Sequence, residues 1–176
     1  TRMQRVERLF MAIPRMVRDL SRELGKVIEL TLEGGDVEMD REMVEMVVDP
    51  LTHIVRNSID HGIEMPADRI AKGKTETGHV NLNAYHQGGN IIIEVTDDGK
   101  GLDCNAIRKK GIERKLIKED TVLSDHELFQ LIFEPGFSTA EKITDVSGRG
   151  VGMDVVRKNI EKLGGMVAIS SEKGKG

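Results

Sequence analysis

A β-hairpin pattern in the middle of the chain limits the folds that the sequence can adopt. Two runs with strand-like alternation, His79 to His86 and Asn90 to Thr96, are joined by Gln87-Gly88-Gly89, and glycines at such a junction favour a tight hairpin turn. A third strand pattern, Lys26 to Glu33, precedes the hairpin and ends at Gly34-Gly35. Because helical patterns lie between and after these runs, we expect an α/β sandwich, with a mixed sheet and helices packed on one face.

Helical spacing of apolar residues predicts the elements around this sheet. Met3 to Leu20 shows the spacing and predicts a helix interrupted at Pro14. Asp40 caps a longer pattern that runs to His61, in which Asp49-Pro50 predicts either a kink or a boundary between two abutting helices. The remaining predictions are a short helix within the loop 64–78, helices at about 104–118, 124–132 and 151–163, and a last strand at 165–170.

Composition excludes several classes of protein. The 176 residues include 26 Lys and Arg against 30 Asp and Glu, and four Phe, one Tyr and no Trp, so the core is expected to be aliphatic and nucleic acid is not an expected partner. The single cysteine, Cys104, excludes an internal disulfide and a Cys-based zinc site. No apolar run approaches the roughly 20 residues of a membrane span, and no signal-peptide core follows the charged start. The predicted location is the cytoplasm.

Three polar side chains follow one face of the helix after Pro50. His53, Asn57 and His61 are spaced i, i+4 and i+8, so they align beside the apolar stripe of that helix. Two imidazoles and a carboxamide there could coordinate a hydrated metal ion and contact anionic oxygens. Solvated or capping side chains give the same pattern, so spacing alone leaves both interpretations open.

Two glycine clusters predict a close approach of the backbone to a ligand. Asp97-Asp98-Gly99-Lys100-Gly101 closes a strand and fits a ligand-binding turn, although an ordinary Asp-Gly turn has the same residues. Ser147 to Met153 contains GxGxG and leads into a helix, whose N-terminal amides favour phosphate. The second cluster matches neither the dinucleotide fingerprint nor a Walker loop. Together the clusters predict a nucleotide cradle of another kind.

Four sequence blocks resemble the motifs of one family of kinases. HIVRNSIDHGIE from His53, DDGKGL from Asp97, FEPGFST from Phe133 and SGRGVGMDVV from Ser147 resemble the N, G1, F and G2 boxes of the CheA family of chemotaxis histidine kinases, which belongs to the GHKL (Bergerat-fold) ATPases. The resemblance implies a two-layer α/β sandwich with a mostly antiparallel sheet and a site for ATP and Mg²⁺. It also implies an ATP-binding catalytic domain over residues 14–176 that is cut inside its G3 box, after a helical stub of the dimerisation domain in residues 1–13.

The resemblance also assigns roles to the residues that match. Asn57 resembles the asparagine that binds Mg²⁺, His53 a polar residue or general base beside the γ-phosphate, and His61 a phosphate-contacting histidine. Asp97 resembles the aspartate that accepts a hydrogen bond from the adenine amino group, and Gly101 the glycine that lets the backbone approach. The other matching residues resemble phosphate-side glycines, parts of the ATP lid and an adenine-pocket residue, and they are Gly148, Gly150, Gly152, Phe137, Ser138 and Met153.

Two positions depart from the family or imitate one of its motifs. Ala106 stands where related kinases often carry a basic residue near the phosphates, so this contact is absent or shifts to Lys109 or Lys110, with Lys110 the stronger candidate. His126 lies in a DHEL sequence without the Arg-Thr-Pro continuation of a phosphoacceptor box. We expect His126 to be a surface histidine.

The function that the resemblance implies is that of a protein-histidine kinase. The γ-phosphoryl group of Mg-ATP would pass to a histidine on a separate phosphotransfer domain, in bacterial chemotaxis signalling. The implied partners are this acceptor domain, the response regulators, and, through domains outside this chain, a coupling protein and chemoreceptors at the inner face of the membrane. The isolated domain is expected to be a monomer and the full-length protein a dimer. A gyrase- or MutL-like ATPase and a non-catalytic nucleotide-binding scaffold are the alternatives.

Overall fold

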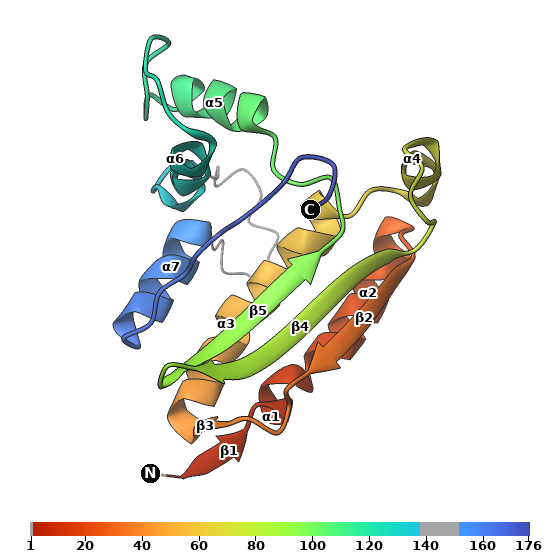
Figure 1. Ribbon diagram of the computed structural model, residues 1–176, viewed down its shortest axis with the longest axis vertical. Coiled ribbons are helices and arrows are strands. Elements are labelled where there is room, and N and C mark those ends of the chain that lie inside the picture. Colours follow the sequence, from red (N-terminus) through yellow and green to blue (C-terminus); the bar gives the residue numbers. More distant parts are fainter. Residues whose placement is uncertain (1, 138–151) are drawn as a thin grey trace. The chain divides into compact units, whose positions relative to one another are not determined.

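The computed structural model describes residues 2–137 and 152–176 of the chain (Figure 1). Contacts between residues divide the chain into two compact units. The first, which we call the sheet unit, comprises residues 2–101 and Lys173–Gly176. The second, the helical unit, is the described part of Leu102–Glu172.

Three strands form the sheet of the sheet unit, in the order β2–β4–β5 (Figure 1). β2 (Ile28–Glu33) runs parallel to β4 (Gly78–Gln87), and β4 pairs antiparallel with β5 (Asn90–Asp97). The turn between β4 and β5 is Gly88-Gly89, with φ of 56° and 82°, and a type I′ turn needs positive φ at both central residues. The predicted hairpin and the strand before it are therefore confirmed.

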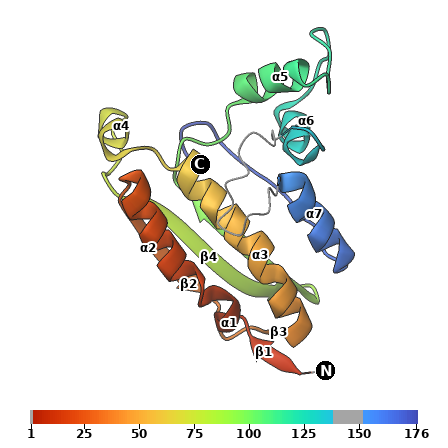
Figure 2. The ribbon, with the colours of Figure 1, turned by 180° about the vertical axis from the view of Figure 1, so that it is seen from behind.

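Two helices, α2 (Ile13–Leu24) and α3 (Arg41–Asn57), cover one face of this sheet (Figure 2). Their apolar side chains share one core with alternate residues of β4, namely Val80, Leu82 and Ala84. The residues between these, Asn81 and Asn83, are half-buried. This arrangement confirms the predicted α/β sandwich with a mixed sheet and helices on one face.

The first residues differ from the predicted helix over Met3 to Leu20. β1 (Met3–Arg5) pairs antiparallel with β3 (Glu38–Asp40), and only then does a short helix, α1 (Glu7–Phe10), begin. The spacing nevertheless predicted the buried residues, which are Val6, Leu9, Phe10 and Ile13. It failed at Met3, which is 56% exposed, because pairing with a distant strand leaves no trace in local spacing. The assignment of residues 1–13 to a dimerisation domain stays a prediction.

Prolines lie inside or at the start of three helices of the sheet unit. Pro14 occupies the first turn of α2, where the missing N–H has no helical partner to lose. Pro66 begins the predicted short helix, α4 (Pro66–Ala71). Pro50 is an interior residue of α3, so the long pattern forms one helix and not two abutting ones. The predicted N-cap of α3 is confirmed, because Asp40 Oδ1 accepts the Glu42 N–H at 2.8 Å.

The helical unit contains three helices and a 3₁₀ turn in its described residues. They are α5 (Cys104–Glu113), α6 (Asp125–Gln130), the 3₁₀ turn Leu131–Phe133 and α7 (Met153–Lys162). The buried side chains of this unit include three of the four phenylalanines, Phe129, Phe133 and Phe137. The prediction of an aliphatic core therefore holds for the sheet unit, apart from Phe10, and is wrong for the helical unit. No helix within the described residues is long and apolar enough to cross a membrane.

The predicted last strand at 165–170 is not a strand in the structure. None of these residues pairs with a described strand. A strand persists only where a neighbour takes up its N–H and C=O groups. An alternating apolar pattern predicts which residues could pair but supplies no partner.

Candidate functional site

The structure distributes the predicted site residues over both units. The sheet unit contains His53, Asn57, His61, Asp97 and Gly101. The helical unit contains Lys110, Phe137, Gly152 and Met153. Ser138, Gly148 and Gly150 lie outside the described residues. The candidate metal ligand and the candidate acceptor for the adenine amino group thus belong to the sheet unit, and the described lid candidate belongs to the helical unit. Candidates for the phosphates and for the adenine pocket occur in both units.

The helix that carries Asn57 changes its geometry directly after this residue. α3 ends at Asn57, and a π-helix follows over Ser58–Gly62, closed by a 2.8 Å hydrogen bond from the N–H of Ile63. A π-helix bonds i to i+5, so His61 does not keep the α-helical alignment with His53 that the spacing predicted. His53 and Asn57 are half-buried, whereas the His61 side chain is 69% exposed. Single π turns are frequent at functional sites.

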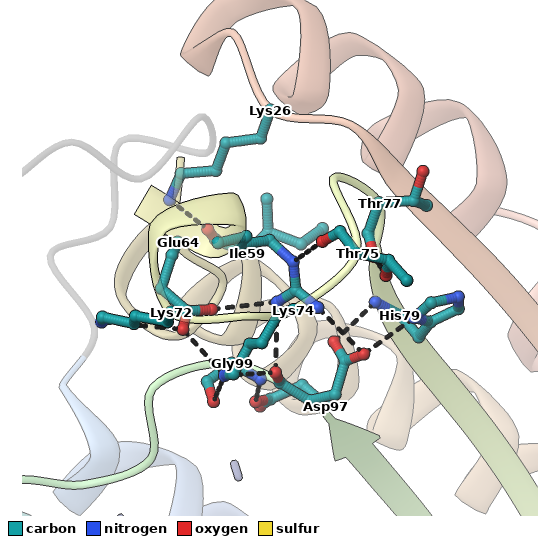
Figure 3. A network of polar contacts seen from close by, with 12 residues as sticks. Lys26, Ile59, Glu64, Lys72, Lys74, Thr75, Thr77, His79, Asp97 and Gly99 are labelled. Atoms are coloured by element: carbon teal, nitrogen blue, oxygen red, sulfur yellow. Dashed lines mark hydrogen bonds and ion pairs between the residues drawn. The ribbon is translucent and has the colours of Figure 1, made fainter. Parts of the chain in front are cut away.

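A lysine from a distant segment holds the end of this π-helix. Lys26 Nζ donates to the carbonyl oxygen of Ile59 at 2.6 Å (Figure 3). It also donates to the carbonyl oxygen of Asp60 at 2.9 Å. The last carbonyls of a helix lack helical partners and favour a cation. Burial lowers the pKa of Lys26, and the Asp60 carboxylate opposes part of this effect. The sequence did not predict the contact, because 33 positions separate Lys26 from Ile59.

Three backbone segments meet at Asp97, and each contributes a glycine. A Cβ added to Gly62 would lie 3.5 Å from both carboxylate oxygens of Asp97. A Cβ on Gly99 would overlap the carbonyl of Gly62, and one on Gly176 would overlap the carbonyl of Asp97. The Lys100 N–H also donates to the Gly62 carbonyl at 2.9 Å. The end of the Asn57 helix, the DDGKG turn and the last described residues therefore approach one another at distances that only glycine permits.

The Asp97 carboxylate is held by the turn that follows it. Its Oδ1 accepts the N–H of Gly99 at 2.9 Å, the local bond by which aspartate stabilises a turn. Asp97 is half-buried. Gly101 has φ of 73°, a left-handed conformation that favours glycine. The result is a fixed carboxylate acceptor suited to an N–H donor.

Behind this turn lies an ion cluster that the sequence did not predict (Figure 3). Arg69, which is 1% exposed, donates to Glu64 Oε1 at 2.9 Å and to Asp98 Oδ2 at 3.2 Å. Lys74 Nζ donates to Glu64 Oε2 at 2.8 Å, and His79 Nδ1 lies 2.7 Å from Asp98 Oδ2. In the sequence, Glu64, Arg69, Lys74 and His79 lie in a polar stretch before and at the hairpin start, and Asp98 follows the hairpin. A charged residue that will be buried cannot be told there from a solvated one.

Both carboxylates of the cluster favour the ionised form. Burial opposes ionisation of Glu64, but hydrogen bonds, chiefly from Lys74, and the Arg69 charge lower its pKa overall. Burial opposes ionisation of Asp98 in the same way, and the N–H and imidazole of His79 lower its pKa. Each buried or half-buried carboxylate thus faces cationic donors, as burial of charge requires.

In the helical unit, two of the predicted residues lie together. Lys110 Nζ lies 4.8 Å from the centroid of the Phe137 ring, within the range of a cation–π interaction. Gly152 is the N-cap of α7 and Met153 its first residue. The N-terminal amides of such a helix attract anions. The Lys110 ammonium, packed against the ring of the predicted lid residue Phe137, and the glycine at the start of α7 are both compatible with phosphate binding.

The described residues offer few ligands for a metal ion. No group of three or more His, Cys, Asp or Glu in 2–137 and 152–176 could hold one. Asn57 supplies one carboxamide oxygen, a hard donor. Mg²⁺ keeps several waters and takes one or two protein oxygens beside substrate phosphates, whereas zinc needs three or four protein ligands. The donor set therefore fits Mg²⁺ that is shared with a nucleotide.

Comparisons with known proteins identify the family to which the chain belongs. The family model described as histidine kinase-, DNA gyrase B-, and HSP90-like ATPase matches residues 46–176. The chain belongs to this family of ATPases. The catalytic domain of the histidine kinase ThkA, in a nucleotide-free form, has a TM-score of 0.53 at 16% identity, over 92% of this chain and 80% of that chain. This likeness concerns the fold, and it supports the α/β sandwich described above.

Three curated relatives are much more similar in sequence. The chain is 56% identical to the sensor histidine kinase CheAY of Helicobacter pylori, over 100% of this chain and 22% of that protein. It is 55% identical to the chemotaxis protein CheA of Klebsiella aerogenes, over 99% and 27%, and 51% identical to CheA of Bacillus subtilis, over 99% and 26%. The chain spans about a quarter of the length of these relatives.

Proposed function

We propose that the chain is the ATP-binding kinase domain of a chemotaxis histidine kinase. One observation carries the proposal: identity of 51–56% to proteins named CheA or CheAY extends over 99% or more of the chain. The turn at Asp97 supports it, because a carboxylate held in place by its own turn suits the amino group of adenine as a hydrogen-bond acceptor. The other proposed base contacts are Gly101, through its backbone, and Met153.

On the phosphate side, the proposed binding groups are glycine amides and donors. Gly152 at the start of α7, with Gly148 and Gly150 before it, would offer backbone N–H groups. Lys110 and His61 would add positive charge or hydrogen bonds. Phe137 and Ser138 would belong to a lid over the nucleotide. Phosphoryl transfer needs mainly alignment and charge neutralisation, and these groups supply both.

The proposed metal ligand is Asn57. Mg²⁺ bound there with the nucleotide would supply charge neutralisation at the phosphates. His53, four residues before Asn57 on α3, would orient the acceptor or the γ-phosphate. The acceptor is a neutral imidazole on a separate phosphotransfer domain. Its nitrogen lone pair forms the bond to phosphorus as the bond to the ADP leaving oxygen breaks, and the imidazole then loses its N–H proton, so His53 need not act as a base.

The proposed partners follow from the same assignment. They are the phosphotransfer domain, the response regulators that receive its phosphoryl group, and a coupling protein with chemoreceptors at the inner face of the membrane, reached through other domains of a dimeric full-length protein. The names of the relatives support a role in chemotaxis signalling. The composition of this chain supports a partner other than nucleic acid.

The test measures nucleotide binding and phosphotransfer by the same protein. Titration calorimetry with ADP and with ATP, each with and without Mg²⁺, should show binding that Mg²⁺ strengthens. Addition of ATP and an isolated phosphotransfer domain should then yield phosphohistidine in trans. Asn57→Ala should reduce the Mg²⁺-dependent rate by about a hundredfold or more, whereas Asn159→Ala, at an exposed position on α7, should leave it unchanged.

Two outcomes would contradict the proposal as a whole, and a third would contradict its metal ligand. Release of free phosphate without phosphohistidine would favour the gyrase- or MutL-like ATPase. Absence of nucleotide binding would leave only a scaffold. An Asn57→Ala variant with the Mg²⁺ dependence of the unaltered chain would show that the metal ligand is wrongly assigned.

A further inference from the structure

The ion cluster behind the Asp97 turn has no part in the proposed function so far. The Arg69 and Glu64 side chains are only 2% and 4% exposed. A buried ion pair is a weak source of stability, because the desolvation of both charges offsets most of their attraction. The contacts of the cluster indicate a second role.

The Arg69 guanidinium reaches from α4 into the turn after β5. Its NH1 donates to the Asp98 carbonyl at 3.1 Å as well as to Glu64, and its NH2 donates to the Asp98 carboxylate. Its Nε donates to the Thr75 carbonyl at 2.8 Å. A planar guanidinium with donors on several sides can join segments in a fixed geometry, which a lysine cannot reproduce. Arg69 thus connects Glu64, two residues after the π-helix, to the residue directly after Asp97.

Lys74 holds the same turn from a second point. Its Nζ donates to the Asp98 carbonyl at 3.0 Å and to the Gly99 carbonyl at 2.7 Å, besides Glu64 Oε2 (Figure 3). Two consecutive peptide groups after Asp97 therefore accept hydrogen bonds from buried or largely buried cations. Hydrogen bonds from a charged donor are about twice as strong as neutral ones, so these carbonyls have little freedom to move.

The position of these peptide groups determines the position of the Asp97 carboxylate. Gly99 receives the Lys74 ammonium on its carbonyl and donates its N–H to Asp97 Oδ1 at 2.9 Å. The Lys100 N–H, which shares a peptide group with the Gly99 carbonyl, donates to the Gly62 carbonyl. If the peptide groups on either side of Gly99 rotate, the Asp97 carboxylate changes its orientation and the turn changes its distance from Gly62. The chain of contacts runs from Lys74 through Gly99 to the carboxylate.

We infer that Arg69 and Lys74 are positioning residues that hold the Asp97 carboxylate in the geometry that selects adenine over other purines. The inference rests on the proposed function, in which Asp97 accepts a hydrogen bond from the adenine amino group. Neither cation contacts the base. Both act through the Asp98–Gly99 peptide groups, so their loss reduces base selectivity and not binding of the phosphates.

The experiment compares ADP with inosine diphosphate, whose base carries a carbonyl oxygen in place of the amino group. Titration calorimetry measures both affinities in the unaltered chain and in Lys74→Met and Arg69→Lys. Lys72→Met is the matched control, because Lys72 approaches the same Glu64 carboxylate at 3.8 Å and its side chain is 53% exposed. Among the described residues, its ammonium forms no hydrogen bond with Asp98 or Gly99. Circular dichroism and thermal unfolding establish that each variant is folded.

The unaltered chain should bind ADP more tightly than inosine diphosphate. In Lys74→Met the affinity for ADP should fall about tenfold, the cost of one charge-assisted hydrogen bond, while that for inosine diphosphate changes by less than about twofold on the same scale. Arg69→Lys should lower the ratio of ADP affinity to inosine diphosphate affinity as well, because one ammonium cannot replace the several fixed N–H donors of the guanidinium. Lys72→Met should keep the original ratio.

Base selectivity separates positioning from a purely structural role. A variant that is only less stable loses both affinities together and keeps their ratio. If Lys74→Met and Arg69→Lys are folded and retain the original ratio, the inference is wrong and the proposed function stands. If the unaltered chain binds neither nucleotide, or binds both equally, the proposed role of Asp97 and the inference fail together.

Discussion

Gly99→Ala tests the central contact of the site, the close approach of the DDGKG turn to the end of the π-helix. Gly99 is buried and its φ is not positive, so alanine fits its backbone conformation. The added methyl would overlap the carbonyl of Gly62 and lie 2.9 Å from the backbone nitrogen of Ile63. These are backbone atoms, which cannot rotate away as a side chain would. The two segments must separate.

The magnitude follows from the contacts that separation disrupts. Overpacking by one methyl in a close-packed site costs about 1–3 kcal/mol. Separation also weakens the 2.9 Å hydrogen bond from the Lys100 N–H to the Gly62 carbonyl, worth about 1 kcal/mol. The sum is about 3 kcal/mol, and at roughly 2–4 °C per kcal/mol for a chain of this size it lowers Tm by about 6–12 °C.

The matched control is Gly62→Ala, on the other side of the same contact. Its Cβ would lie 3.5 Å from the Asp97 carboxylate oxygens, an ordinary contact, so the change in Tm should stay within about 2 °C. Thermal unfolding followed by circular dichroism, without nucleotide, measures both variants. Equal Tm values for Gly99→Ala and Gly62→Ala would refute the reasoning, since they would show that the turn and the π-helix do not touch as described.

Two further predictions concern a charge and a helix cap. Below about pH 4.5, the unfolding free energy of Glu64→Gln should fall less steeply with falling pH than that of the unaltered chain. The pKa of Glu64 is lowered in the folded state, so its carboxylate stabilises the folded state above its ordinary pKa. This stabilisation is lost as the pH falls and Glu64 takes up a proton. Acid titration of urea unfolding measures the slopes, and equal slopes contradict the prediction. Ser124→Ala removes the capping box with Glu127 and should cost about 1 kcal/mol, whereas exposed Ser170→Ala should cost almost nothing. Equal losses in thermal unfolding would exclude the cap.

The sequence predicted those features whose causes are local. The Gly88-Gly89 turn could be predicted because a two-residue hairpin needs two positive φ values, and the start of α3 because Asp40 accepts the N–H of Glu42. The stripe of Leu51, Val55 and Ile59 is buried as a 3.6-residue period requires. These signals depend on neighbours within a few positions of the chain.

The features that escaped prediction depend on segments far apart in the sequence. β1 pairs with β3 across more than 30 residues, and Arg69 contacts Asp98 across 29. A single charged residue in a polar stretch gives no sign of the carboxylate that it will meet. The local sequence likewise did not predict the π-helix after Asn57, because the Lys26 ammonium that binds its carbonyls comes from the distant segment between α2 and β2.

The glycines of the predicted nucleotide motifs have a structural explanation that does not require a ligand. Gly62, Gly99 and Gly176 belong to three separate motifs, yet a Cβ on Gly99 or Gly176 would strike a backbone carbonyl of another segment. These two glycines are therefore needed for the three segments to meet at all, before any phosphate or base arrives. Gly101, with φ of 73°, is required by its conformation. The occurrence of these motifs together thus reflects one packed junction around Asp97, and the proposed adenine contact is the one role of this junction that packing does not already explain.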